Sequence, residues 1–244
     1  MMKALLAIAA LVLVAGNAFA QSAQLPGVAI NFGQGTNLVD TIEVLLLFTV
    51  LTMAPAIVIL CTSFTRIIIV LSFMRQPLGT QNLPPNQLLI GFAMFLSIFV
   101  MMPTGKVIFE NGIKPYMAKQ ISATEAIGVL EIGMRGFMQK HVRKTDIGLF
   151  YVVLGESLCS KVDDVPILYL FLAFIISELK TAFQIGFLLY IPFLVLDMVV
   201  ASVLMAMGMM MLPPMLVSMP FKLLLFVLVD GWALVTGSIL RSFN

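Results

Sequence analysis

The sequence predicts an all-α protein of the membrane type, and three observations carry that prediction. Of its 244 residues, 61% are apolar and only 11% are charged, whereas soluble domains carry about 25% charged residues. The mean hydropathy is +1.08 and the formal net charge is +2. Apolar stretches long enough to cross a ~30 Å hydrocarbon core recur along the chain. We therefore expect long kinked helical hairpins with a small water-facing helical insert.

The same composition argues against several functional classes. A near-neutral charge balance offers no electrostatic footprint for nucleic acid. The two cysteines, Cys61 and Cys159, cannot build a disulfide framework, so we expect free thiols. His141 is the only histidine, and the sequence contains no zinc-binding, phosphate-binding or nucleophile motif. We expect neither an enzyme nor a bound metal or cofactor.

Residues 1–20 have the form of a secretory signal peptide. A basic residue precedes a short apolar run, and an A-x-A pattern predicts cleavage between Ala20 and Gln21. A short first membrane helix is the weaker alternative, because the run has only about 10–12 residues where about 20 are needed. Cleavage would leave an N-terminal arm, residues 21–39, on the periplasmic side of a bacterial inner membrane.

Residues 40–105 are expected to form the first helical hairpin. The apolar stretch over 41–74 is too long for one simple span, and Pro55 is free to kink it. A Pro-Pro pair separates this stretch from a second uncharged segment, residues 86–105. We expect Pro103 and Gly105 to close that second span.

Residues 106–164 form a different kind of segment. They hold 15 of the 26 charged residues in 59 positions, which predicts a water-facing insert, here on the periplasmic side. Ser122 and Glu125 make a capping-box pattern for a helix over about 123–144. A second helix should cover about 146–158.

Residues 165–244 are expected to form a second helical hairpin region. The Pro213-Pro214 pair must interrupt any helix. We therefore expect residues 193–212 and 216–240 to pack as the two arms of a hairpin.

Charged side chains inside the apolar helices must face partners or water, because an unpaired charge in hydrocarbon costs several kcal/mol. A proton path and structural ion pairs both remain open, and pairing is favoured because acidic residues alternate with lysines. We predict that Glu178 and Lys222 pair between neighbouring subunits. The other buried charges expected are Arg66, Lys180, Asp197 and Asp230.

Methionines concentrate around a loop at residues 205–211. Seven of the fifteen residues in 205–219 are methionine, and Met209, Met210 and Met211 are consecutive. Core filling and a soft, adaptable constriction explain this run equally well. A copper site is the weakest reading, since no histidine or cysteine lies nearby.

Several contiguous segments resemble the FliP family of flagellar type III export gate proteins. The matching segments are Thr62–Val70, Pro84–Gln87, Ser177–Phe187, Ile191–Leu194, Ser202–Pro214 and Pro220–Trp232. The resemblance covers about residues 40–244, and a cleaved signal peptide is usual in the flagellar members.

The resemblance implies a core subunit of an export gate, required for flagellum assembly. Family members form a ring of five that joins FliQ and FliR in a helical channel for unfolded flagellar proteins, near FlhB and FlhA in the basal body. It implies that Met209, Met210 and Met211 form a gasket closing this channel. An injectisome homologue is the nearest alternative, and a proton-coupled transporter is a more remote one.

Overall fold

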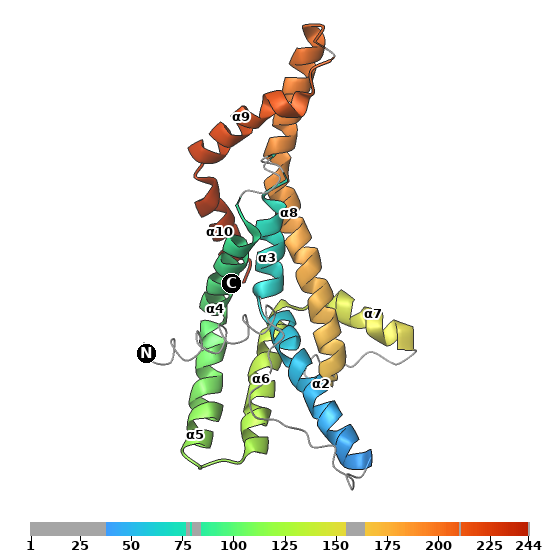
Figure 1. Ribbon diagram of the computed structural model, residues 1–244, viewed down its shortest axis with the longest axis vertical. Coiled ribbons are helices and arrows are strands. Elements are labelled where there is room, and N and C mark those ends of the chain that lie inside the picture. Colours follow the sequence, from blue (N-terminus) through green and yellow to red (C-terminus); the bar gives the residue numbers. More distant parts are fainter. Residues whose placement is uncertain (1–37, 77–78, 80–83, 155–163, 210, 244) are drawn as a thin grey trace. The chain divides into compact units, whose positions relative to one another are not determined.

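The computed structural model describes residues 38–76, 79, 84–154, 164–209 and 211–243, and every regular element within them is a helix (Figure 1). The predicted cleavage site at Ala20 and Gln21, most of the N-terminal arm and Cys159 lie outside these residues. The chain divides into two compact units, Met1–Val58 and Ile59–Asn244.

The described part of the first unit is a single helix, α2 (Leu38–Leu60), whose last two residues belong to the second unit. α2 runs through Pro55 and ends at Leu60. The interruption within the long apolar stretch therefore lies at residues 61–63 rather than at the proline. One proline removes a single backbone hydrogen bond, and apolar helices tolerate that loss.

The second unit contains the remaining helices. In chain order they are α3 (Phe64–Phe73), α4 (Asn86–Ile108), the π-helical turn η1 (Phe109–Ile113), α5 (Lys114–Met117), α6 (Ala123–His141), α7 (Lys144–Leu154), α8 (Ile167–Ala206), α9 (Pro214–Leu228) and α10 (Gly231–Arg241).

The predicted end of the second span at Pro103 and Gly105 is wrong, because the helix runs through both residues. Pro103 lies inside α4, which passes through η1 into α5 and continues the helical path to Met117. Lysine and glutamate are good helix formers, so the shift to charged residues after position 105 changes the environment of the helix without ending it.

Both predicted helices of the insert are present. Ser122 accepts a hydrogen bond from the Glu125 amide, and the Glu125 carboxylate accepts one from the Ser122 amide, which completes the predicted capping box. These donated hydrogen bonds from Ser122 hold the pKa of Glu125 below its usual value. α6 ends at His141, three residues before the predicted end, and α7 follows after two residues.

The C-terminal region forms a hairpin around the Pro213-Pro214 break, but the predicted second arm over 216–240 is wrong as a single helix, because the chain breaks at Val229 and Asp230. Its first arm is longer than predicted, because α8 passes through Pro192 and spans 40 residues, or about 60 Å. α9 begins at Pro214 and packs against α8, and its axis makes an angle of 64° with that of α10. At this bend Asp230 has a φ of 49°. Gly231 leaves room for the Phe226 ring, since a Cβ there would lie 2.1 Å from it.

Two apolar cores hold the second unit together. The first joins α3 and α4 to α8, α9 and α10, and its buried members include Ile67, Val70, Leu89, Ala182, Phe226 and Ile239. The second joins α6 and α7 to the first half of α8, and it includes Phe137, Met138, Ile147, Tyr151, Leu170 and Phe174. The Phe243 side chain packs against both cores.

Among the described residues, two helical segments are long and apolar enough to cross a membrane: Asn86–Met117 and Ile167–Ala206. The bent pairs α2 with α3 and α9 with α10 would raise the number to four if each pair formed one span. These assignments rest on length and composition, and they agree with the predicted membrane-type fold class.

Candidate functional site

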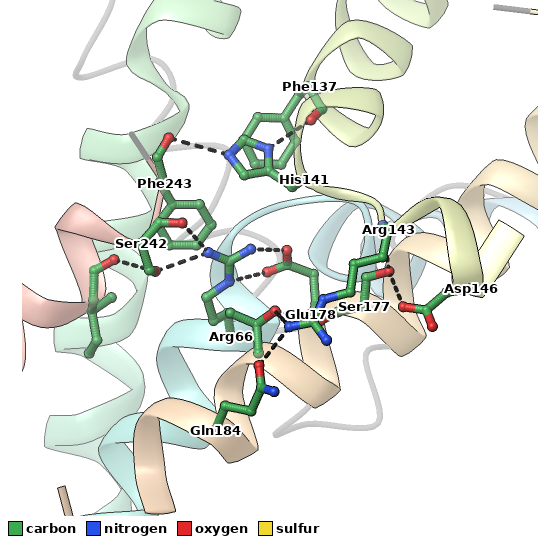
Figure 2. Close-up of polar contacts among 12 residues, drawn as sticks. Arg66, Phe137, His141, Arg143, Asp146, Ser177, Glu178, Gln184, Ser242 and Phe243 are labelled. Atoms are coloured by element: carbon green, nitrogen blue, oxygen red, sulfur yellow. Dashed lines mark hydrogen bonds and ion pairs between the residues drawn. The ribbon is translucent and has the colours of Figure 1, made fainter. Parts of the chain in front are cut away.

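A buried ion pair forms the centre of the most polar cluster in the second unit (Figure 2). Arg66 of α3 is 2% exposed and Glu178 of α8 is fully buried. The Arg66 Nε atom donates to Glu178 Oε2 at 2.9 Å, and Nη2 donates to Oε1. This two-point contact matches the planar guanidinium to the carboxylate and offsets the cost of burying both charges.

The segment after α10 binds the other side of the same guanidinium. Arg66 Nη1 donates to the Ser242 carbonyl oxygen at 2.7 Å and to Ser242 Oγ at 2.9 Å. The Ser242 hydroxyl in turn donates to the Ile239 carbonyl oxygen. The Phe243 ring centroid lies 3.9 Å from Arg66 Cζ, which is close enough for a cation–π contact.

His141, at the end of α6, contacts this segment from the insert. Its Nδ1 atom lies 2.8 Å from the Phe137 carbonyl oxygen, and Nε2 lies 3.4 Å from the Phe243 carbonyl oxygen. The imidazole ring packs against the Phe137 and Phe243 rings, with centroids 4.6 and 5.4 Å away. Figure 2 shows dashed lines from the imidazole to the Phe137 and Phe243 carbonyl oxygens.

A second branch of the cluster ties the start of α7 to α8. Ser177 Oγ donates to Asp146 Oδ2 at 2.7 Å and accepts from the Arg143 amide. The Arg143 guanidinium donates to Thr181 Oγ1 and to Gln184 Oε1. These bonds fix the connection between α6 and α7 against one face of α8.

A second ion pair joins the two arms of the hairpin. Lys222 of α9 donates to Asp197 of α8 at 2.6 Å, and Ser218 donates to the other carboxylate oxygen. The Lys222 side chain is 3% exposed and that of Asp197 is 30% exposed. The pair therefore fixes the register of α9 against α8.

Within one chain, Glu178 and Lys222 do not pair with each other, and each has another partner. Glu178 binds Arg66, and Lys222 binds Asp197. A Glu178–Lys222 pair between subunits stays a prediction that a single chain does not test, and forming it would require both of these contacts to break. Lys180 and Asp230 are exposed in this chain, in contrast to the burial expected for them.

The methionine-rich turn lies between α8 and α9. Gly208 follows Met207, the C-cap residue of α8, and has a φ of +74°. The Met209 amide donates to the Leu204 carbonyl at 3.0 Å, the pattern of a Schellman cap. Met209 is 40% exposed and Met211 is 99% exposed, whereas Met210 lies outside the described residues. Met209 and Met211 are therefore exposed in the single chain and do not fill its cores.

The polar cluster uses several residues to which the sequence assigned no role. His141 stood out only as the single histidine, while Ser242 and Phe243 carry no recognisable motif. Among the described residues, no group of three or more histidine, cysteine, aspartate or glutamate side chains could hold a metal ion. Cys61 is a free, half-buried thiol.

These features define a helical membrane-type protein, with helices long and apolar enough to cross a membrane in the described residues and two ion pairs between its apolar helices, Arg66–Glu178 and Asp197–Lys222. A sequence model of the FliP family matches residues 47–239, and on this match the chain belongs to the FliP family.

The relatives are called flagellar biosynthetic protein FliP. The Bacillus subtilis relative is 54% identical over 207 residues, covering 85% of this chain and 94% of its own length. The Cereibacter sphaeroides relative is 51% identical, covering 89% of this chain and 73% of its own length. The Aquifex aeolicus relative is 44% identical over 98% of this chain and 99% of its own length. Family membership is consistent with a component of the flagellar export apparatus in the inner membrane.

Proposed function

We propose that this chain is a core subunit of the flagellar protein export gate. Five copies, together with FliQ and FliR, would enclose the channel through which unfolded flagellar proteins leave the cell. Family membership supports this assignment, and so does the large apolar surface of the single chain. Long helices such as α4 and α8 expose residues including Phe95, Phe99, Phe187 and Leu188, which suits lateral packing against other subunits.

The observation that carries a sealing role is the exposed methionine turn. Met211 is almost fully exposed in a turn whose flanking helices are fixed to each other by the Asp197–Lys222 pair. Methionine is apolar, flexible and polarisable, so a ring of these side chains can pack closed without binding a passing chain through fixed charge. Met209, Met210 and Met211 would form the gasket of the channel.

Replacing Met209, Met210 and Met211 together by alanine tests this role. Alanine is too short to fill the same opening, so the membrane should leak ions and small solutes while the complex still assembles. Solute uptake by cells expressing the variant measures the leak, and native mass spectrometry of the extracted complex measures assembly.

The matched control is Met198→Ala, which removes an exposed methionine of α8 away from the turn. An intact complex with unchanged permeability in the triple variant would contradict the gasket role. A monomer that does not associate with FliQ and FliR would instead contradict the whole assignment.

A further inference from the structure

The Ser242–Phe243 segment contacts both apolar cores of the second unit, which α8 also connects. Phe243 packs against the core of α3, α4 and the hairpin, and it also packs against the core of α6 and α7. The same two residues supply Arg66 with two hydrogen bonds and a ring face. The segment is therefore a latch between the hairpin and the insert.

His141 of the insert contacts this latch through its ring and its Nε2 atom. Both of its ring nitrogens face carbonyl oxygens, those of Phe137 and Phe243. A carbonyl oxygen only accepts hydrogen bonds, and a neutral imidazole has only one N–H. The doubly protonated ring is the form that donates to both oxygens at once.

In the neutral ring, one nitrogen lone pair must face a carbonyl oxygen, and that contact is repulsive. The shorter contact, from Nδ1 to Phe137 within the same helix, has the better geometry for retaining the remaining proton. The contact that is lost is then the one from Nε2 to the latch.

We propose that Ser242–Phe243 is a proton-dependent latch, which His141 holds while its imidazole is doubly protonated and releases when the ring becomes neutral. Histidine is the side chain that ordinarily changes charge between about pH 5 and pH 8. Acidification within this range therefore tightens the latch, and a rise in pH loosens it. The inference does not depend on the proposed channel function.

The charged groups around His141 are compatible with an added proton. Arg66 of α3 lies behind the Phe243 ring, and the Glu178 carboxylate of α8 neutralises it. Glu178 also interacts electrostatically with His141. On the insert side, Lys140 is exposed to solvent, while Arg143 and Asp146 are bound to residues of α8.

Amide hydrogen exchange tests the latch in the full chain, extracted from membranes in mild detergent. Protection of the Ser242 and Phe243 amides is measured from pH 5 to pH 8, relative to an unstructured peptide at each pH. We expect protection to fall about three- to tenfold as the pH rises, the size expected for loss of one hydrogen bond. Because the chain has a single histidine, deuterium exchange at its imidazole C2 position reports the His141 titration directly.

Two variants complete the test. His141→Gln has no titratable group at this position. In this variant the protection of the Ser242 and Phe243 amides should not change between pH 5 and pH 8. Lys140→Gln removes a charge from the neighbouring exposed position and should keep the wild-type step. The proposal is overturned if wild-type protection does not change, if the step persists in His141→Gln, or if its midpoint differs from that of the imidazole titration.

Discussion

Arg66 shows how a single residue organises the second unit. Its guanidinium donates from one edge to the Glu178 carboxylate and from the remaining nitrogen to Ser242. One face of the group lies against the Phe243 ring. An arginine suits this position better than a lysine, because its planar group presents donors in several fixed directions. Three segments far apart in sequence are therefore held by one side chain.

At the residue scale, we predict that Glu178→Gln is strongly destabilising. Removing one partner leaves a buried charge uncompensated, which typically costs about 3–5 kcal/mol. Replacing both Arg66 and Glu178 by methionine should recover a large part of this loss, because no charge then remains buried. Unfolding of the detergent-solubilised chain with increasing SDS provides the measurement.

Lys180→Gln is the matched control for this pair, since Lys180 lies two residues away on α8 and is exposed. Its stability should stay within about 0.5 kcal/mol of the wild type. If Glu178→Gln were as stable as this control, the ion pair would have no structural role.

At the scale of the helical elements, the prolines show what could be predicted from sequence and what could not. The two Pro-Pro pairs lie where helices begin, as expected, and α4 and α9 each start directly at or after them. The single prolines at positions 55, 103 and 192 lie inside helices. One missing hydrogen bond is tolerated in a long apolar helix, whereas two adjacent prolines also exclude the helical conformation at the first of them.

We predict that the turn after α8 depends on a glycine at position 208. Its φ of +74° disfavours any residue with a Cβ, and no atom lies within 4 Å of the position that a Cβ would take. Gly208→Ala should therefore destabilise the turn through backbone conformation alone, by about 1–2 kcal/mol. The Met209 amide should then exchange about tenfold faster. Gly208→Asn should retain more of the protection, because asparagine tolerates this conformation better.

Gly105→Ala serves as the control for this substitution. Gly105 also has open space around it but lies within the helical run of α4, so alanine should preserve or raise helix stability there. Equal protection of the Met209 amide in Gly208→Ala and the wild type would show that the cap does not fix the turn.

At the scale of the whole molecule, composition was sufficient to predict the helical membrane-type class, whereas the water-facing position of the insert stays a prediction. It was also clear that the intramembrane charges need partners. Their pairing could not be predicted, because Arg66 and Glu178 are separated by 112 residues and meet only through the packing of α3 on α8. Local patterns, such as the capping box before α6, contain no information about such long-range contacts.

The proposed periplasmic position of the insert is also testable at this scale. In a chain with both native cysteines replaced by serine, Lys119→Cys places a thiol in the connection between α5 and α6. A membrane-impermeant maleimide should label it in intact spheroplasts. Gln76→Cys, at an exposed position three residues after the end of α3, should react only after permeabilisation. The opposite labelling pattern would reverse the orientation.

The arrangement around Arg66 also has a consequence for biosynthesis. Arg66 leaves the ribosome 112 residues before Glu178 and 176 residues before Ser242. During that interval α3 carries a guanidinium that none of these partners can yet satisfy, so α3 cannot reach its final buried position. Hydration or a temporary partner must hold this helix while the rest of the chain is translated. The native pairing of Arg66 must therefore follow the synthesis of α8 and of the C-terminal segment.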